Sequence, residues 1–64
     1  MNITLNGEAA TTEAATVAEL VSEVGAPEAG TAVAVDGEVV PRSEWATKLA
    51  EGAAVDILTA VQGG

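Results

Sequence analysis

The chain has 64 residues, of which ten are acidic and two basic, and its formal net charge is −8. Cys, His, Tyr and Phe are absent, which removes the usual nucleophiles, proton-transfer groups and soft ligands, so a metal site is not expected. A domain this small leaves no room for an enzyme's cleft, and a surface this acidic repels phosphate; we therefore expect neither catalysis nor a nucleic-acid or membrane partner.

The first predicted element is a β-hairpin. Residues 2–6 alternate polar and apolar side chains, which is the pattern of a half-buried strand. Asn6 and Gly7 follow, and both residue types tolerate the positive φ of a tight turn. Residues 8–12 should therefore return as an antiparallel partner strand.

A helix is predicted next, because the apolar side chains recur at spacings of three and four. These are Val17, Leu20, Val21 and Val24. Thr16 and Glu19 have the spacing of a capping box, in which each side chain accepts a hydrogen bond from an otherwise unpaired amide. Gly25 should end the helix, with Pro27 beyond it.

A second hairpin is predicted around Asp36-Gly37. Residues 31–35 are rich in Val and Ala, and residues 38–40 form the returning strand, which Pro41 stops. The hairpin therefore contributes two further strands.

A single helical turn is expected after the second hairpin. We expect Ser43 to cap it and Trp45, the only aromatic residue, to cover one edge of the core. Glu51-Gly52 should then turn the chain again. These elements lead into the last strand.

Residues 54–61 are predicted to form the terminal strand. Val55 and Ile57 fall on one face of it, and Asp56 and Leu58 fall on the other. The strand is followed by the residues Gln62, Gly63 and Gly64.

This order of elements predicts an α+β fold. One main helix can cover one face of a mixed sheet of four to five strands. If the last strand is central and parallel to the first, the layout is the ubiquitin-like β-grasp, although a split βαβ arrangement with another strand order fits the same pattern. We expect one domain over residues 1–61 and a flexible Gly-Gly tail over residues 62–64.

The tail is the candidate chemical site. Glycine loses more backbone entropy on ordering than any other residue, and without a Cβ it can pass through a narrow channel. Gly63 and Gly64 are therefore suited to carrying the terminal carboxylate into the active site of another protein. The alternative is a frayed chain end with incidental glycines.

Two segments resemble the thiamine-pathway sulfur carriers (ThiS-type), which belong to the ubiquitin-like β-grasp superfamily. Residues 35–45, with the sequence VDGEVVPRSEW, resemble the hairpin and turn of that family, and residues 55–64, VDILTAVQGG, resemble its terminal strand and tail. Their order, their spacing and the length of the chain agree with the family as well.

The resemblance implies a carrier rather than an enzyme. The Gly64 carboxylate would be adenylated by a ubiquitin-activating-type adenylyltransferase (ThiF-like), and the ATP and magnesium would belong to that partner, with no cofactor on this chain. A persulfide derived from a cysteine desulfurase would then convert the carboxylate to a thiocarboxylate, which would give its sulfur to thiazole synthase (ThiG-like). Gly63 and Gln62 would enter the partner's active site with it.

Leu58 and Arg42 are candidate docking residues for such a partner. Leu58 points away from the face of Val55 and Ile57, and Arg42 can pair with an acidic side chain. The alternatives are a partly apolar outer sheet face and a solvated surface arginine.

Three other functions fit the same sequence. One is the small molybdopterin-synthase subunit, which shares the fold and the Gly-Gly end but is usually longer and richer in Phe. The others are a ubiquitin-like protein modifier and a plain acidic interaction domain. For all of them, the lack of cysteine and of a signal-like or apolar segment favours the cytoplasm, and we expect a monomer when the chain is free.

Overall fold

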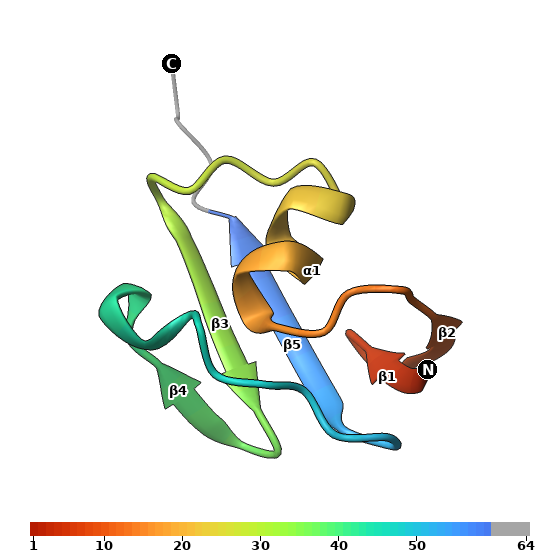
Figure 1. The fold of residues 1–64 in the computed structure, drawn as a ribbon. Coiled ribbons are helices and arrows are strands. Elements are labelled where there is room, and N and C mark those ends of the chain that lie inside the picture. The colour runs from red at the N-terminus through yellow and green to blue at the C-terminus, as the bar shows by residue number, and fades with distance from the viewer. Residues whose placement is uncertain (60–64) are drawn as a thin grey trace.

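The structure is a computed structural model that describes residues 1–59, and it is shown in Figure 1. Its elements in chain order are β1 (Asn2–Leu5), β2 (Glu8–Thr11), α1 (Val17–Glu23), β3 (Thr31–Val35), β4 (Glu38–Val40), the 3-10 helix η1 (Arg42–Glu44) and β5 (Ala54–Thr59). Residues 60 and 61 of the predicted last strand, and the predicted tail at 62–64, lie outside the described residues.

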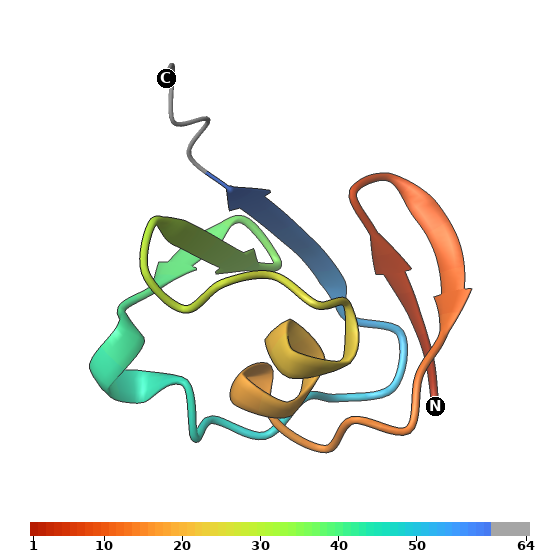
Figure 2. The ribbon, with the colours of Figure 1, turned by 90° about the horizontal axis from the view of Figure 1, so that it is seen from above.

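Within residues 1–59 the strands form one mixed sheet in the order β2-β1-β5-β3-β4. Strand β5 is central and runs parallel to β1 and antiparallel to β3. Helix α1 packs on one face of the sheet, as the view from above shows (Figure 2). This strand order confirms the predicted β-grasp and rules out the alternative split βαβ order.

Both hairpin turns have the backbone conformation that the sequence predicts. The φ angles are 51° at Asn6 and 84° at Gly7, and 51° at Asp36 and 86° at Gly37. Two successive positive φ angles are characteristic of the type I′ turn, whose twist matches that of the flanking strands. The predicted hairpins β1–β2 and β3–β4 are therefore confirmed.

The ends of α1 are held largely as predicted. The Thr16 hydroxyl accepts a hydrogen bond from the Glu19 amide at 3.2 Å. The Glu19 carboxylate accepts from the amide of Ala15 at 2.7 Å, one residue before the position of an ordinary capping box. At the other end Gly25 has a φ of 77° and the amide of Ala26 bonds the Val21 carbonyl at 3.1 Å, as in a Schellman motif.

The core lies between α1 and the sheet. Its most deeply buried side chains are Leu20, Val17, Val21, Val33 and Val55. Trp45 is also buried, and its indole N–H donates to the Val40 carbonyl at 3.1 Å. The prediction that Trp45 covers the core is therefore confirmed.

The predicted cap at Ser43 is wrong. Helix η1 begins at Arg42, and the N-cap position is occupied by Pro41, two residues before Ser43, without a side-chain hydrogen bond. The Pro41 carbonyl accepts from the Glu44 amide at 2.8 Å. The Arg42 carbonyl accepts from the Trp45 amide at 3.2 Å, so the turn is closed by backbone hydrogen bonds alone. Proline restricts its own φ to a value that suits this position.

Candidate functional site

The candidate site is the end of β5, the strand from which the chain continues toward Gly64. Val55 and Ile57 anchor β5 in the core, with exposed fractions of 1% and 9%, whereas Asp56 and Leu58 are exposed on the opposite face. The predicted alternation is thus confirmed. Thr59 pairs with Thr31 of β3, so its position is set by the sheet.

The predicted tail residues Gln62, Gly63 and Gly64 lie outside the described residues. Their roles in carrying a modified carboxylate and in entering a partner's active site stay predictions.

Leu58 belongs to an apolar patch on the face of the sheet opposite α1. Leu58 is 70% exposed and Val39 on β4 is 74% exposed. Ala32 pairs with Leu58, and Ala34, two residues further along β3, pairs with Val39. Since side chains of paired residues lie on the same side of a sheet, these four side chains form one surface, here called the outer-face patch.

Val39 is a residue of this patch that sequence reasoning missed. The sequence assigns it only to a short strand, although its alternation with Val40 places the two side chains on opposite faces. The alternation could therefore have identified Val39 as a companion of Leu58. The docking role predicted for Leu58 itself stays a prediction.

Arg42 is engaged within the chain. Its guanidinium lies 2.6 Å from the carboxylate of Glu28, and both side chains are more than half exposed. Arg42 follows the edge strand β4, whereas Leu58 is on β5, with β3 between those two strands. The structure therefore places the two predicted docking residues apart, and Arg42 already has an ion-pair partner within the chain.

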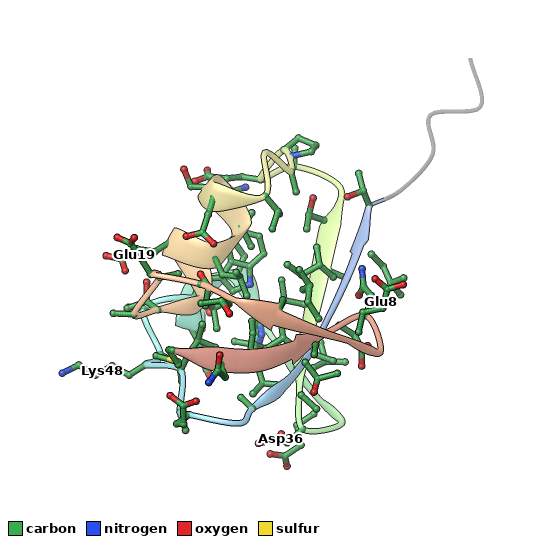
Figure 3. All side chains as sticks on the ribbon, turned by 90° about the vertical axis from the view of Figure 1, so that its right-hand side faces the viewer. Glu8, Glu19, Asp36 and Lys48 are labelled. Carbon is green, nitrogen blue, oxygen red and sulfur yellow. The ribbon has the colours of Figure 1, made fainter. Side chains whose placement is uncertain are left out.

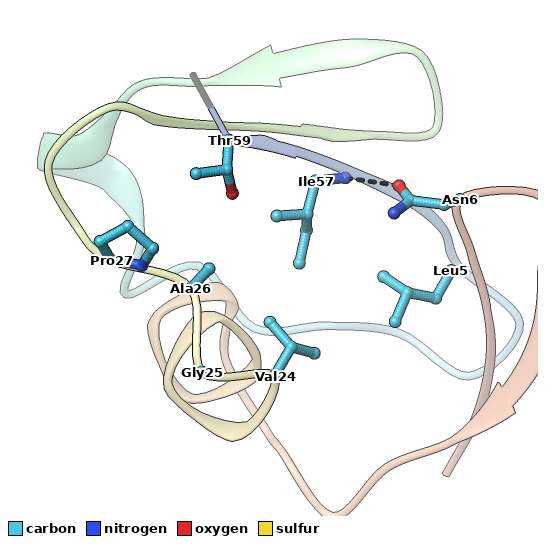
Figure 4. A pocket seen from close by; sticks show the side chains of 8 residues that line it. All are labelled: Leu5, Asn6, Val24, Gly25, Ala26, Pro27, Ile57 and Thr59. Carbon is cyan, nitrogen blue, oxygen red and sulfur yellow. Dashed lines mark hydrogen bonds between the residues drawn. The ribbon is translucent and has the colours of Figure 1, made fainter. Parts of the chain in front are cut away.

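A groove lies beside the end of β5, on the same side of the sheet as α1. It has a volume of about 360 Å³ and is open to solvent. The groove is lined by Leu5, Asn6, Val24, Gly25, Ala26, Pro27, Ile57 and Thr59 (Figure 4). The expectation that so short a chain leaves no room for a cleft is wrong to this extent, because the loop after α1 stands away from β5. None of the lining side chains is ionisable, however.

Acidic side chains are spread widely over the molecule. In Figure 3 the carboxylates of Glu8, Glu19 and Asp36 project outward from three different parts of the chain, and Lys48 projects from a fourth. Among residues 1–59, no three His, Cys, Asp or Glu side chains gather in a way that could hold a metal ion. No helix in this range is long and apolar enough to cross a membrane.

Comparison with known proteins connects this fold to one family. The model of the ThiS family matches residues 3–64. A crystal structure of a thiamine biosynthesis protein (ThiS) from Geobacter metallireducens is 35% identical, with 100% of each chain covered and a TM-score of 0.77. A solution structure of a thiamine biosynthesis protein from the same organism is 36% identical over 100% of this chain and 88% of the other, with a TM-score of 0.83. No curated protein matches the chain.

Proposed function

Because the chain belongs to the ThiS family, we propose that it is a sulfur carrier of thiamine biosynthesis and that the carboxylate of Gly64 is the group that carries the sulfur. The chain is then a co-substrate of other enzymes rather than an enzyme itself. Its partners are an adenylyltransferase, which activates the carboxylate, and a thiazole synthase, which takes the sulfur. This chemistry takes place in the cytoplasm.

Activation is needed because a carboxylate is a stabilised anion with a very poor leaving group. The Gly64 carboxylate attacks the α-phosphate of ATP, which the adenylyltransferase binds with magnesium, and pyrophosphate leaves. The terminal sulfur of a persulfide then attacks the acyl carbon and AMP leaves, which gives an acyl disulfide. A thiol of the sulfur-donating system attacks the other sulfur of this bond, so that a new disulfide forms and the thiocarboxylate is released. The resulting thiocarboxylate holds sulfur in a form that thiazole synthase can use.

The observation that carries this proposal is the family match, which extends to the terminal residue Gly64. The position of β5 supports it, since the central strand leads directly to the C-terminus. Five residues follow Thr59, and an extended segment of that length spans at most about 18 Å. A partner that reacts with Gly64 must therefore come close to the end of β5, and the folded domain helps to position the carboxylate.

The outer-face patch is the surface that we assign to the adenylyltransferase. Leu58 and Val39 are large apolar side chains that are mostly exposed, and Leu58 is one residue before the end of β5. The two alanines between them leave the surface shallow. The acidic charge of the chain favours a partner with basic residues around an apolar contact.

The test is the intact mass of the chain after incubation with its host's adenylyltransferase, ATP, magnesium, a persulfide source and a reducing thiol. We expect the mass to rise by the difference between sulfur and oxygen. A variant with one alanine added after Gly64 should fold normally but gain no sulfur, because its carboxylate is displaced and carries a side chain beside it. The substitution Gly63→Ala, which keeps the carboxylate on Gly64, tests the narrow passage separately.

Full loading of the extended variant would refute the assignment of Gly64. Growth of the host in thiamine-free medium separates the thiazole pathway from the molybdopterin alternative. Lysine-linked adducts of the chain in cell extract would favour a protein modifier instead.

A further inference from the structure

The backbone groups of β5 point alternately toward its two neighbours. The Asp36 amide donates to the Ala54 carbonyl at 2.7 Å, so the backbone groups of Ala54 point toward the β3–β4 hairpin. The Asn6 amide donates to the Val55 carbonyl at 2.8 Å, so the backbone groups of Val55 point toward β1. By the same alternation, the amide and carbonyl groups of Ile57 and Thr59 face the β1 side.

Pairing on the β1 side stops before β5 ends. The last pair in the register is Leu5 with Val55. One more hydrogen bond follows, because the side-chain oxygen of Asn6 accepts from the Ile57 amide at 2.8 Å (Figure 4). Asn6 thus makes the last two hydrogen bonds on the β1 side of β5. Its backbone amide donates one and its side-chain oxygen accepts the other, and the chain then turns away into β2.

The next position along β5 is open. Within residues 1–59, neither the Ile57 carbonyl nor the Thr59 amide has a hydrogen-bond partner. One residue of an additional strand can bond both groups: its amide donates to the Ile57 carbonyl, and its carbonyl accepts from the Thr59 amide. Asn6 bonds the Val55 carbonyl and the Ile57 amide in the same way, with its side chain as the acceptor. Strand addition at an open sheet edge is a common mode of peptide recognition.

The groove described above adjoins this open edge and is suited to apolar side chains. Ile57 and Thr59 contribute one wall, and Val24 and Ala26 contribute the other. Val24 is 43% exposed although it is apolar. A β-branched or similar side chain of an added strand can therefore pack between the end of α1 and the sheet.

The charges beside the groove are acidic. Glu8 pairs with Leu5 across the first hairpin and is exposed. Glu23 directly precedes Val24, and its carboxylate accepts from the Thr12 hydroxyl at 2.5 Å. Glu28 follows Pro27 but is already paired with Arg42. An occupant with basic side chains flanking its apolar residue is favoured by these charges, and an acidic one is repelled.

From the open edge, the apolar lining and the flanking carboxylates, we propose that this groove binds an extended cationic segment of a partner protein, which adds to β5 as a short strand. The site lies on the α1 side of the sheet and differs from the outer-face patch. It does not depend on whether the tail carries sulfur. Two partners, or two parts of one partner, can thus hold the domain from both sides of β5.

The experiment titrates the ¹⁵N-labelled full chain with the capped peptide Lys-Val-Lys-Val-Lys and follows the amide resonances. We expect saturable shifts at Asn6, Val24, Ile57 and Thr59. Two control peptides, Lys-Ser-Lys-Ser-Lys and Glu-Val-Glu-Val-Glu, should bind much more weakly, because each lacks either the apolar or the cationic component.

The decisive variant is Thr59→Pro. Proline removes the amide of residue 59, which faces away from β3, so the sheet keeps its hydrogen bonds. We expect the Kd for Lys-Val-Lys-Val-Lys to rise by about tenfold, the effect of one lost hydrogen bond. Thr59→Val is the matched control, since it keeps the amide and the β-branched shape, and it should bind like the original chain.

Several results would overturn the proposal. They are shifts that never saturate, shifts confined to the outer-face patch, equal binding of the Ser-containing peptide, and unchanged affinity of Thr59→Pro. If Thr59→Pro fails to fold, hydrogen exchange of the Thr59 amide in the original chain decides: slower exchange with the peptide supports strand addition, and unchanged exchange refutes it.

Discussion

At the scale of single residues, Asn6 and Asp36 have equivalent roles in the two hairpins. Each is the first central residue of its turn with a φ of 51°. Each also accepts a hydrogen bond from β5 with its side chain: Asn6 from the Ile57 amide at 2.8 Å, and Asp36 from the Ala54 amide at 2.9 Å. Both turns are therefore tied to the central strand as well as to their own hairpins.

Replacing Asn6 tests this tie. Asn6→Gly preserves the positive φ but leaves the part-buried Ile57 amide without its acceptor, so we expect the free energy of unfolding to fall by about 1 kcal/mol. Hydrogen exchange at the Ile57 amide should also become faster. Asn6→Asp keeps an acceptor in the same place and should preserve most of the protection. Equal exchange rates at Ile57 in the Gly variant and the original chain would contradict this role.

At the scale of elements, α1 depends heavily on its ends. It has seven residues, and isolated helices of that length are unstable in water. Its stability therefore comes from the burial of Val17, Leu20 and Val21 and from its caps. The start is also held by tertiary contacts, because the Val17 amide donates to the Thr47 carbonyl and the Ala18 amide to the Trp45 carbonyl.

The N-cap is open to a direct test. Thr16→Ala removes the acceptor of the Glu19 amide and should lower the free energy of unfolding by about 1 kcal/mol in urea denaturation. Thr16→Ser keeps a hydroxyl in the same position and should lose much less. A Thr16→Ala variant as stable as the original would mean that the contacts with residues 45–47 hold the start of α1 without the cap.

At the scale of the whole molecule, the sheet has two different faces. One packs on α1 and forms the core, and the other carries the exposed Leu58 and Val39. An α+β domain with one helix covers only one face of its sheet. The outer-face patch therefore contributes little to folding and is available for a partner.

This division predicts separate effects on stability and on activation. Leu58→Ser should change the free energy of unfolding by no more than about 0.5 kcal/mol, because the side chain is exposed. Loss of an apolar anchor at an interface should raise the KM of the adenylyltransferase for this chain by about tenfold. Ala9→Ser, an exposed residue on the edge strand β2, is the control and should leave KM unchanged. An unchanged KM in Leu58→Ser would remove Leu58 from the docking surface.

Most of the fold follows from local signals. Asn-Gly and Asp-Gly each favour the two positive φ angles of a type I′ turn, and the apolar spacing from Val17 to Val24 identifies the helix. The alternation in β5 separates the buried Val55 and Ile57 from the exposed Leu58. The N-cap of η1 lies two residues before the predicted one, at Pro41, and the turn is closed by backbone hydrogen bonds without a hydroxyl cap.

The sequence by itself thus determined the elements, their buried faces and the resemblance that leads to Gly64, because turn conformation, periodicity and local motifs depend on neighbouring residues. Only the tertiary structure decided which strands meet, where pairing between β1 and β5 ends, and that Arg42 is bound to Glu28. Those outcomes depend on contacts between distant residues, such as Asn6 with Ile57, 51 positions apart. No local pattern encodes such a contact, so the open edge and its groove appear only once the chain is folded.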